Sequence, residues 1–339
     1  KEHNPDHFYT TRIECEYQPK AKCPEWDRFC KLIFADSSDP EDMQRHLEEL
    51  CGYAISMSRW LKTWVLFHGP KDTGKSTVAE VLKRMLGNAY LGYALGRFDA
   101  GKQNQFTENA LIGKLVLVDD DFEKAGMLPD GFLKKISEEK SMSSEQKWGD
   151  TFQFVSRALP IICSNHWPKS KDLTDAIRER ALVFPFHYKI AGAHRSDARR
   201  NAMLKELPGM LNRFIAGIQR LRARGDWDVP MDCADARDDW VANSNMVALF
   251  LRNNVERADA DLLATDAWTR FEQWNRTEVG HSHHKTVGRN SFYEHLDSLL
   301  GARIKAHASA LVYRGWQLKQ DPIVDEMQDA DNVDDWDED

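Results

Sequence analysis

The sequence predicts an α/β protein organised around a phosphate-binding loop, with helices before the loop and a helical module near the end of the chain. Three observations lead to this fold class. Residues 64–77 run from an apolar, β-prone stretch through glycine, four residues and Gly-Lys-Ser into a helix-like stretch. A second apolar run, residues 115–118, is followed directly by three aspartates. Beyond residue 225, helical patterns precede a β-ribbon, which is the order of a winged-helix module.

The phosphate-binding loop carries the first predicted site. Its glycines let the backbone wrap closely around a phosphate, and its N–H groups and the helix N-terminus supply positive potential. We expect Lys75 to reach the β- and γ-phosphates and the Ser76 hydroxyl to ligate Mg²⁺. The strand before the loop and the helix after it favour a nucleoside-triphosphate site over a chance glycine-rich turn. The predicted ATP-binding residues are Gly69, Pro70, Lys71, Asp72, Thr73, Gly74, Lys75, Ser76 and Thr77.

Three aspartates after the second apolar run predict the other half of an ATPase site. In such a site one carboxylate holds Mg²⁺ and its neighbour orients or activates the attacking water. Asp119 and Asp120 fit these roles, with Asp119 as the metal ligand, and Asp121 is a competing register. The alternative is an ordinary acidic turn, and a position roughly forty residues beyond a phosphate-binding loop argues against it.

Two later segments add polar groups to this predicted site. A third apolar strand, residues 158–163, leads into Asn165, and an amide there would sense the γ-phosphate and position water if this strand neighbours the first. Residues 175–186 give a helix end with two arginines that feeds a fourth strand. Arg178 and Arg180 are either surface charges or include a finger that reaches the γ-phosphate of a neighbouring subunit.

A predicted β-hairpin carries the candidate DNA contact. The alternating run 151–155 predicts a strand, and Lys147 and Trp148 fall at the natural turn before it. A lysine beside an aromatic residue at an exposed tip suits contact with a single-stranded backbone. An ordinary hairpin with a solvated lysine is the alternative.

The remaining chain completes the predicted organisation. Residues 24–36 place apolar side chains on one helical face, and a second helix starts near residue 39, so 1–60 is expected to form a helical collar. The ATPase core is predicted over 61–225. Residues 226–320 would form the winged-helix-like domain, with helices at 237–257, 265–277 and 288–300 and a β-ribbon at 304–318. The acidic tail, residues 321–339, is expected to be disordered.

Composition limits the possible partners and compartments. The formal net charge is −8, and removing the ten acidic residues of the tail leaves +2, so nucleic-acid binding would need local basic surfaces. No run approaches the roughly 20 apolar residues of a membrane span, and no secretory signal is present. The six cysteines show no paired spacing and predict reduced thiols in the cytoplasm, the host cytoplasm if a phage encodes the protein.

The ordered set of motifs resembles the helicase part of phage and plasmid primase-helicases, which are superfamily-3 helicases of the AAA+ type related to the poxvirus primase-helicase. The resemblance spans about residues 15–318 and is strongest over 64–186. The matching stretches are Tyr17–Trp26, Gly52-Tyr53, Gly69–Ser76, Gly113–Val118, Trp148-Gly149 with Phe152 and Phe154, Ser164–Pro168, Asp175–Arg180, Phe184–Phe186 and Leu207–Gly209. Two departures occur: Glu179 separates the two arginines, and the glutamate common in the family's acidic motif falls at Asp121.

This resemblance implies an AAA+ core and an ATP-driven DNA helicase that forms a hexamer-like ring and moves 3′→5′ on single-stranded DNA in phage or plasmid replication. No primase active site is visible, so any primer synthesis is expected upstream of Lys1. The C-terminal module is a common docking unit, so a primase or another replication protein is an expected partner. Two rival hypotheses are a small-molecule kinase, which would lack the Asn165 and arginine motifs, and an AAA+ regulator or loader that binds a protein without unwinding DNA.

Overall fold

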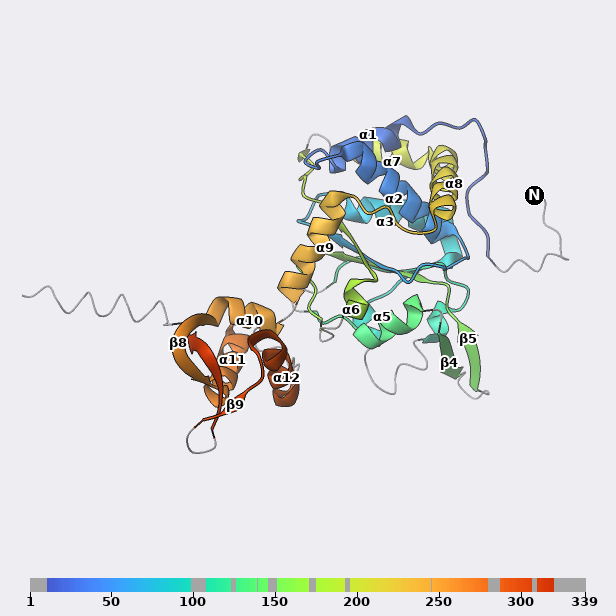
Figure 1. The fold of residues 1–339 in the computed structure, drawn as a ribbon. Helices are drawn as coiled ribbons and strands as arrows, with labels where there is room; N and C mark the ends of the chain where they lie inside the picture. Colours follow the sequence, from blue (N-terminus) through green and yellow to red (C-terminus); the bar gives the residue numbers. More distant parts are fainter. Residues whose placement is uncertain are drawn as a thin grey trace, which may run out of the picture. The chain divides into compact units, whose positions relative to one another are not determined.

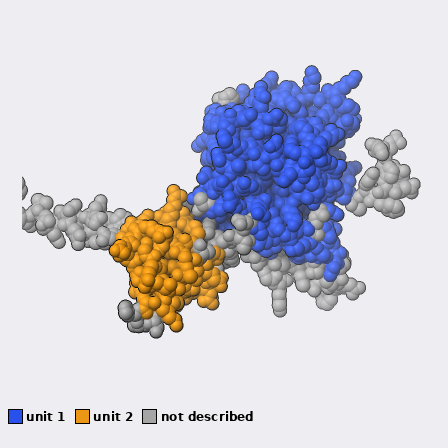
Figure 2. All heavy atoms as spheres, viewed as in Figure 1, with its two compact units in different colours: residues 1–244 blue, residues 245–339 orange. Residues whose placement is uncertain are grey.

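The computed structural model describes residues 11–98, 108–122, 126–138, 140–145, 151–170, 175–192, 196–244, 246–279, 287–306 and 310–319. The chain divides into two compact units, Lys1–Ser244 and Asn245–Asp339, which are coloured separately in Figure 2. Within the described ranges, no helix is both long and apolar enough to cross a membrane.

A sheet of five parallel strands forms the centre of the first unit. The strands are β1 (Trp64–His68), β2 (Tyr90–Gly92), β3 (Val116–Asp119), β6 (Leu159–Ser164) and β7 (Ala181–Pro185). Their order across the sheet is β2-β3-β6-β1-β7. Every residue of β3, β6 and β7 is buried, as expected for apolar runs in a parallel sheet that is covered on both faces.

Helices cover both faces of this sheet. Val65 and Phe67 of β1 lie in one apolar cluster, and the alternate residues Trp64 and Leu66 lie in another. Figure 1 shows α1, α2, α3, α7 and α8 over one face and α5 and α6 over the other, which gives three α/β/α layers. The helices are α1 (Pro24–Ile33), α2 (Pro40–Ile55), α3 (Lys75–Leu86), α5 (Asp130–Ser137), α6 (Asp175–Arg178), α7 (Asp197–Leu204) and α8 (Leu207–Arg224).

The two N-terminal helices share their core with the sheet and do not form a compact unit of their own. The reason is the close packing of α2 on α8. A methyl group at Gly52 would lie 2.2 Å from the carbonyl oxygen of Phe214, and one at Gly217 would lie 2.6 Å from that of Glu48. Glycine at both positions lets the two helix backbones touch, so α1 and α2 share the core of the phosphate-binding loop.

Arg59 fastens the end of α2 to the sheet. Its guanidinium donates hydrogen bonds to three carbonyls at or just after the C-terminal end of α2. It also donates to the carbonyls of Leu115 and Arg157, which precede β3 and β6, at 2.8 Å each. The last carbonyls of a helix have no hydrogen-bond donors within the helix, and here the Arg59 side chain supplies donors to them.

His46 is a buried titratable group in this core, and we expect it to make the first unit sensitive to acid. It stacks on Phe184 with ring centroids 4.9 Å apart, and no described residue is hydrogen-bonded to either ring nitrogen. Burial, with the nearby charge of Arg224, lowers the pKa of His46 from 6.5 to about 3. The unfolded chain therefore takes up this proton near pH 6.5 while the folded chain does not, so stability is intact above pH 6.5 and falls as the pH drops toward 3.

Below pH 6.5, His46 is expected to lower the free energy of unfolding by up to about 1.4 kcal/mol per pH unit. The variant His46→Phe is expected to abolish this loss. Urea unfolding of the first unit at pH 7, 6 and 5 measures this slope. Lys83→Gln is the control, because Lys83 is exposed on α3 and lies outside this core, so its loss should leave the slope unchanged. Equal slopes in the wild type and His46→Phe would contradict the assignment.

The second unit begins at Asn245, whereas the sequence pattern predicts a domain boundary before residue 226. Helix α9 (Met231–Ser244) accounts for the difference, because it packs on β7 of the first unit. Trp240 lies against Trp64 with ring centroids 5.2 Å apart, and its Nε1 donates to the carbonyl of Pro168 at 3.0 Å. The helix predicted over 237–257 is therefore wrong as one element and is two helices, α9 and α10 (Met246–Asn254).

The second unit packs three helices on a three-stranded antiparallel sheet of order β8-β10-β9, with strands β8 (Val255–Leu263), β9 (Ile304–Lys305) and β10 (Leu311–Leu318). Its aromatic core includes Phe250, Phe271 and Phe292. Helices α11 (Ala264–Val279) and α12 (Arg289–Leu300) lie near the predicted positions. Strand β8 was not predicted.

A separate antiparallel hairpin belongs to the first unit. It consists of β4 (Ser141–Glu145) and β5 (Thr151–Val155), paired from Ser141 with Val155 to Glu145 with Thr151. Strand β5 matches the alternating run in the sequence. The predicted turn residues Lys147 and Trp148 lie outside the described residues.

Candidate nucleotide-binding site

The carboxyl ends of three neighbouring strands bring the predicted site residues to one edge of the sheet. β1 lies between β6 and β7, and β6 lies beside β3, so the prediction that the strand before Asn165 neighbours the first strand is confirmed. His68 pairs with Ser164, and Asp119 pairs with Ile162. The phosphate-binding loop, Asp119 and Asn165 therefore meet at this edge, where open α/β sheets bind their ligands.

The loop conformation requires glycine at both ends. Gly69 has a φ of +150°, and a methyl group there would lie 1.9 Å from the carbonyl oxygen of Phe186. Gly74 has a φ of +99°, and a methyl group there would meet Ile33 of α1 at 2.6 Å. The first glycine allows the loop to leave β1 beside β7, and the second allows α3 to begin directly beneath α1.

Lys75 is the central cation of this edge. Its Nζ donates to the carbonyls of Gly69 and Pro70 at 2.6 Å each and to Oδ1 of Asn165 at 3.0 Å. The residue is 7% exposed, and burial lowers the pKa of its amine. The predicted phosphate-binding lysine and the predicted sensor amide are thus in direct contact, although 90 positions separate them in the sequence.

Asp119 is the buried carboxylate of the site. Its Oδ2 accepts a hydrogen bond from the backbone N–H of Leu95 at 2.7 Å. Burial raises its pKa, and the backbone hydrogen bonds from Leu95 and Asp121 act against that rise. Asp120 and Asp121 are exposed beside it. A nearby cation would relieve the cost of burying the Asp119 charge, and Ser76 offers an exposed hydroxyl at the start of α3.

These donors suit a magnesium ion that is shared with phosphates. Ser76 and Asp119 supply hard oxygen atoms, which Mg²⁺ prefers. Among the described residues, no group of three or more His, Cys, Asp or Glu side chains could hold a metal by itself. A metal at this edge would complete its ligand shell with phosphate and water oxygens, as Mg²⁺ commonly does.

The two predicted arginines lie at the opposite edge of the sheet. They precede β7, and because Ala181 pairs with Trp64 at the start of β1, neither lies on the edge that carries Lys75. Arg178 has a 45% exposed side chain and donates to Asp238 of α9 at 3.1 Å. Arg180 has an 11% exposed side chain and is paired with Glu138. Within this chain, neither arginine is therefore beside Lys75.

Several residues around the loop are not predicted by the sequence patterns. His68 stacks on Trp167 with ring centroids 3.4 Å apart, which joins the end of β1 to the segment after Asn165. Burial lowers the pKa of His68 to about 4, and burial raises the pKa of Cys163 to about 12. A cavity of about 920 Å³ between α1 and α7 was also missed. The run Asn165-His166-Trp167 is the sequence signal for the stack on His68, because it contains Trp167. No sequence pattern pairs α1 with α7, so the cavity had no such signal.

Comparisons with known proteins give a shared fold. Three apo structures of the NrS-1 C-terminal region match with TM-scores of 0.52 to 0.56 at 11% to 14% identity. The matches cover 90% to 91% of this chain and 78% to 79% of theirs. The JCV helicase also matches, at 16% identity over 65% of each chain, but its TM-score of 0.33 is too low to establish a common fold.

At the sequence level, the matched region coincides with the candidate site. No curated protein matches the chain. A family model described as a family of unknown function, DUF5906, matches residues 67–180. This segment begins within β1 and ends at Arg180, so it includes the phosphate-binding loop, Asp119 and Asn165. The first unit thus belongs among mixed α/β proteins with a parallel sheet, and its site lies in the region that the family model recognises.

Proposed function

We propose that the protein is an ATP-dependent DNA helicase of the superfamily-3 AAA+ type, the motor part of a phage or plasmid primase-helicase. The contact between Lys75 Nζ and Asn165 Oδ1 at 3.0 Å carries the proposal. It joins a lysine that binds terminal phosphates to an amide that can respond to the γ-phosphate. The resemblance noted in the sequence adds translocation in the 3′→5′ direction and a cytoplasmic location.

In this proposal the chain's own residues divide the work. Lys75 and the loop N–H groups of residues 69–77 bind ATP, and Asn165 reads whether the γ-phosphate is present. Asp119 and Ser76 would hold Mg²⁺, which supplies charge neutralisation on the phosphates. Asp120 orients the attacking water, with Asp121 as its competitor for that role. When Lys75 binds the phosphates of ATP, it would release the side chain of Asn165. The segment after β6 would thereby respond to whether nucleotide is bound.

Ring assembly and DNA binding complete the proposal. The arginines at the opposite edge of the sheet would complete the site of a neighbouring subunit, which favours a hexamer-like ring. Lys147 and Trp148, between β4 and β5 in the sequence, would contact single-stranded DNA. The second unit, with its helix, strand, two helices and two strands, is proposed to be a winged-helix module that docks a primase or another replication protein.

Single-stranded DNA is expected to stimulate ATP hydrolysis by the whole chain severalfold, and Lys147→Ala is expected to abolish that stimulation. The physical reason is that a motor hydrolyses faster when the strand it moves is engaged by its hairpin. Steady-state hydrolysis with and without an oligonucleotide measures both effects. Lys205→Ala, an exposed lysine outside the hairpin, is the control that should behave as the wild type.

The outcomes separate the proposal from its rivals. Hydrolysis that is indifferent to DNA would remove the motor function and favour the AAA+ regulator or loader that acts on a protein partner. Phosphate transfer to a small molecule, without DNA stimulation, would favour the kinase. Unwinding of a duplex that carries only a 3′ single-stranded tail would support the direction, whereas unwinding only with a 5′ tail would contradict it.

A further inference from the structure

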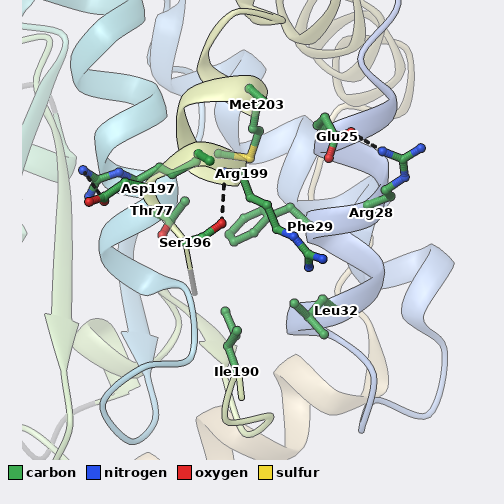
Figure 3. Close-up of a pocket in the computed structure, with 13 residues that line it drawn as sticks. Glu25, Arg28, Phe29, Leu32, Thr77, Ile190, Ser196, Asp197, Arg199 and Met203 are labelled. Atoms are coloured by element: carbon green, nitrogen blue, oxygen red, sulfur yellow. Dashed lines mark hydrogen bonds and ion pairs between the residues drawn. The ribbon is translucent and has the colours of Figure 1, made fainter. Parts of the chain in front are cut away.

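A cavity of about 920 Å³ lies between α1 and α7, beside the phosphate-binding loop (Figure 3). This size is typical of pockets that bury a drug-sized or nucleotide-sized molecule. Its wall belongs to segments that are far apart in the sequence: α1, the start of α3, Ile190, and α7 with its cap Ser196. All of them lie in the first unit.

Direct contacts connect the cavity to the phosphate-binding loop. Thr77, one residue after Ser76, forms part of the cavity wall. A methyl group at Gly74 would lie 3.1 Å from Cζ of Phe29, so the aromatic ring of α1 lies against the loop itself. On the other side, the N–H of Ile190 donates to the carbonyl of Asp72 at 2.9 Å. A molecule with its phosphates on the loop can therefore extend into this cavity.

The two sides of the cavity are held together by Glu206, which follows α7. Its Oε2 accepts hydrogen bonds from the N–H groups of Glu25 at 2.8 Å and Trp26 at 3.3 Å, at the start of α1. These bonds satisfy N–H groups that a helix start leaves without partners. The spacing between α1 and α7 is thus fixed by hydrogen bonds at one end of the cavity.

The chemistry of the wall is apolar at its centre and charged at its ends. Phe29, Leu32, Ile190 and Met203 supply the apolar surface. Glu25 and Arg28 are paired with each other on one side of the pocket, and on the opposite side Asp197 is paired with Arg200 at 3.3 Å (Figure 3).

Ser196 is also engaged within its own helix. Its Oγ accepts from the N–H of Arg199 at 3.2 Å as the cap of α7. The cavity therefore offers an aromatic face and aliphatic groups, while these polar wall residues are occupied by partners beside them. A flat aromatic molecule is the ligand class that such a wall favours.

We propose that this cavity receives the nucleoside part of a bound nucleoside triphosphate, whose base stacks on Phe29 and is held with little selection among the four bases. The assignment rests on the proposed nucleotide-binding function. Every base has a π-face, so stacking tolerates any of them. Strong discrimination would need a wall group dedicated to the hydrogen-bonding edge of one base.

The test compares nucleotides with a probe that has no base. Binding of ATP, GTP, CTP, UTP and inorganic tripolyphosphate, each with Mg²⁺, is measured by titration calorimetry on the whole chain. We expect the wild type to bind the four nucleotides within about tenfold of one another. Phe29→Leu, which keeps an apolar side chain against Gly74, should weaken all four by roughly tenfold and leave tripolyphosphate unchanged.

Two further variants keep the outcomes distinguishable. Phe29→Trp preserves an aromatic face and should retain nucleotide affinity, and Trp60→Leu, which removes a partly exposed aromatic residue outside the cavity wall, should change nothing. Equal weakening of tripolyphosphate by Phe29→Leu, unchanged nucleotide binding, or a strong preference for one base would each overturn the cavity assignment. Lys75→Met should weaken tripolyphosphate as well as the nucleotides, and if it does not, the proposed function fails instead.

Discussion

Lys75→Met is expected to lower ATP hydrolysis by about a hundred- to a thousand-fold, the usual loss when one preorganised charge is removed from a reacting group. Lys75 Nζ contacts the carbonyls of Gly69 and Pro70 and the Asn165 amide, so it lies where the loop would present it to terminal phosphates. Methionine keeps most of the apolar stem and removes the cation. Steady-state phosphate release with Mg²⁺ and saturating ATP measures the effect.

Stability measurements separate this loss from misfolding. Lys75 is buried and its pKa is lowered by that burial, so the fold gains little from its charge, and Met in its place should leave thermal stability unchanged or higher. Lys83→Met is the matched control, because Lys83 lies exposed on the same helix and should keep wild-type hydrolysis. Hydrolysis by Lys75→Met within a few-fold of the wild type would place the nucleotide elsewhere.

The local parts of this site could be predicted because their signals lie in short stretches of sequence. The apolar run of β1, the spacing of Gly69 and Gly74, and the aspartates that begin at the last residue of β3 each specify a strand end or a turn without reference to the rest of the chain. The position of Asn165 near the loop could be predicted in the same way, because the carboxyl ends of neighbouring parallel strands lie at one edge of the sheet. The predicted neighbours then met as expected, with Lys75 against Asn165.

What could not be predicted depends on packing between distant segments. The backbone contact of Gly52 with α8 draws the N-terminal helices into the core, and no local pattern encodes that contact. Strand β8 contains Asp259 and Asp261, which have low strand propensity, and it forms because it pairs with β10 at the edge of its sheet. The cavity wall combines α1 with α7, about 170 positions apart, so only the fold reveals it.

Arg178→Ala is expected to abolish ATP hydrolysis while the fold stays intact, and Arg180→Ala is expected to destabilise the first unit by about 2 kcal/mol. The reason is the difference in burial between the two ion pairs. The Arg178–Asp238 pair is exposed, and such pairs contribute little, so the guanidinium can leave it for another partner. Arg180 is held by Glu138 in a mostly buried pair, and its removal would leave that carboxylate with the more exposed Lys140 as its remaining ion-pair partner in the described structure.

Activity, stability and the location of the site can be measured on the same two variants. Urea unfolding should separate Arg180→Ala from the wild type, whereas Arg178→Ala should unfold as the wild type does. Hydrolysis by Arg178→Ala should fall by roughly a thousand-fold or more, the usual effect of losing an arginine finger. Asp238→Ala is the matched control, because it removes the exposed partner of Arg178 and leaves the guanidinium available.

Mixing two inactive variants tests whether Arg178 acts on a neighbouring subunit. In a ring that contains both Arg178→Ala and Lys75→Met subunits, about a quarter of the interfaces combine an intact Lys75 with an intact Arg178 from the next subunit. Hydrolysis should therefore return when the two inactive proteins are mixed and allowed to exchange subunits. No recovery on mixing, or full activity of Arg178→Ala alone, would show that Arg178 is a surface charge. Recovery with Arg180→Ala in its place would transfer the role to Arg180, and the buried pair with Glu138 would then have to open during each cycle.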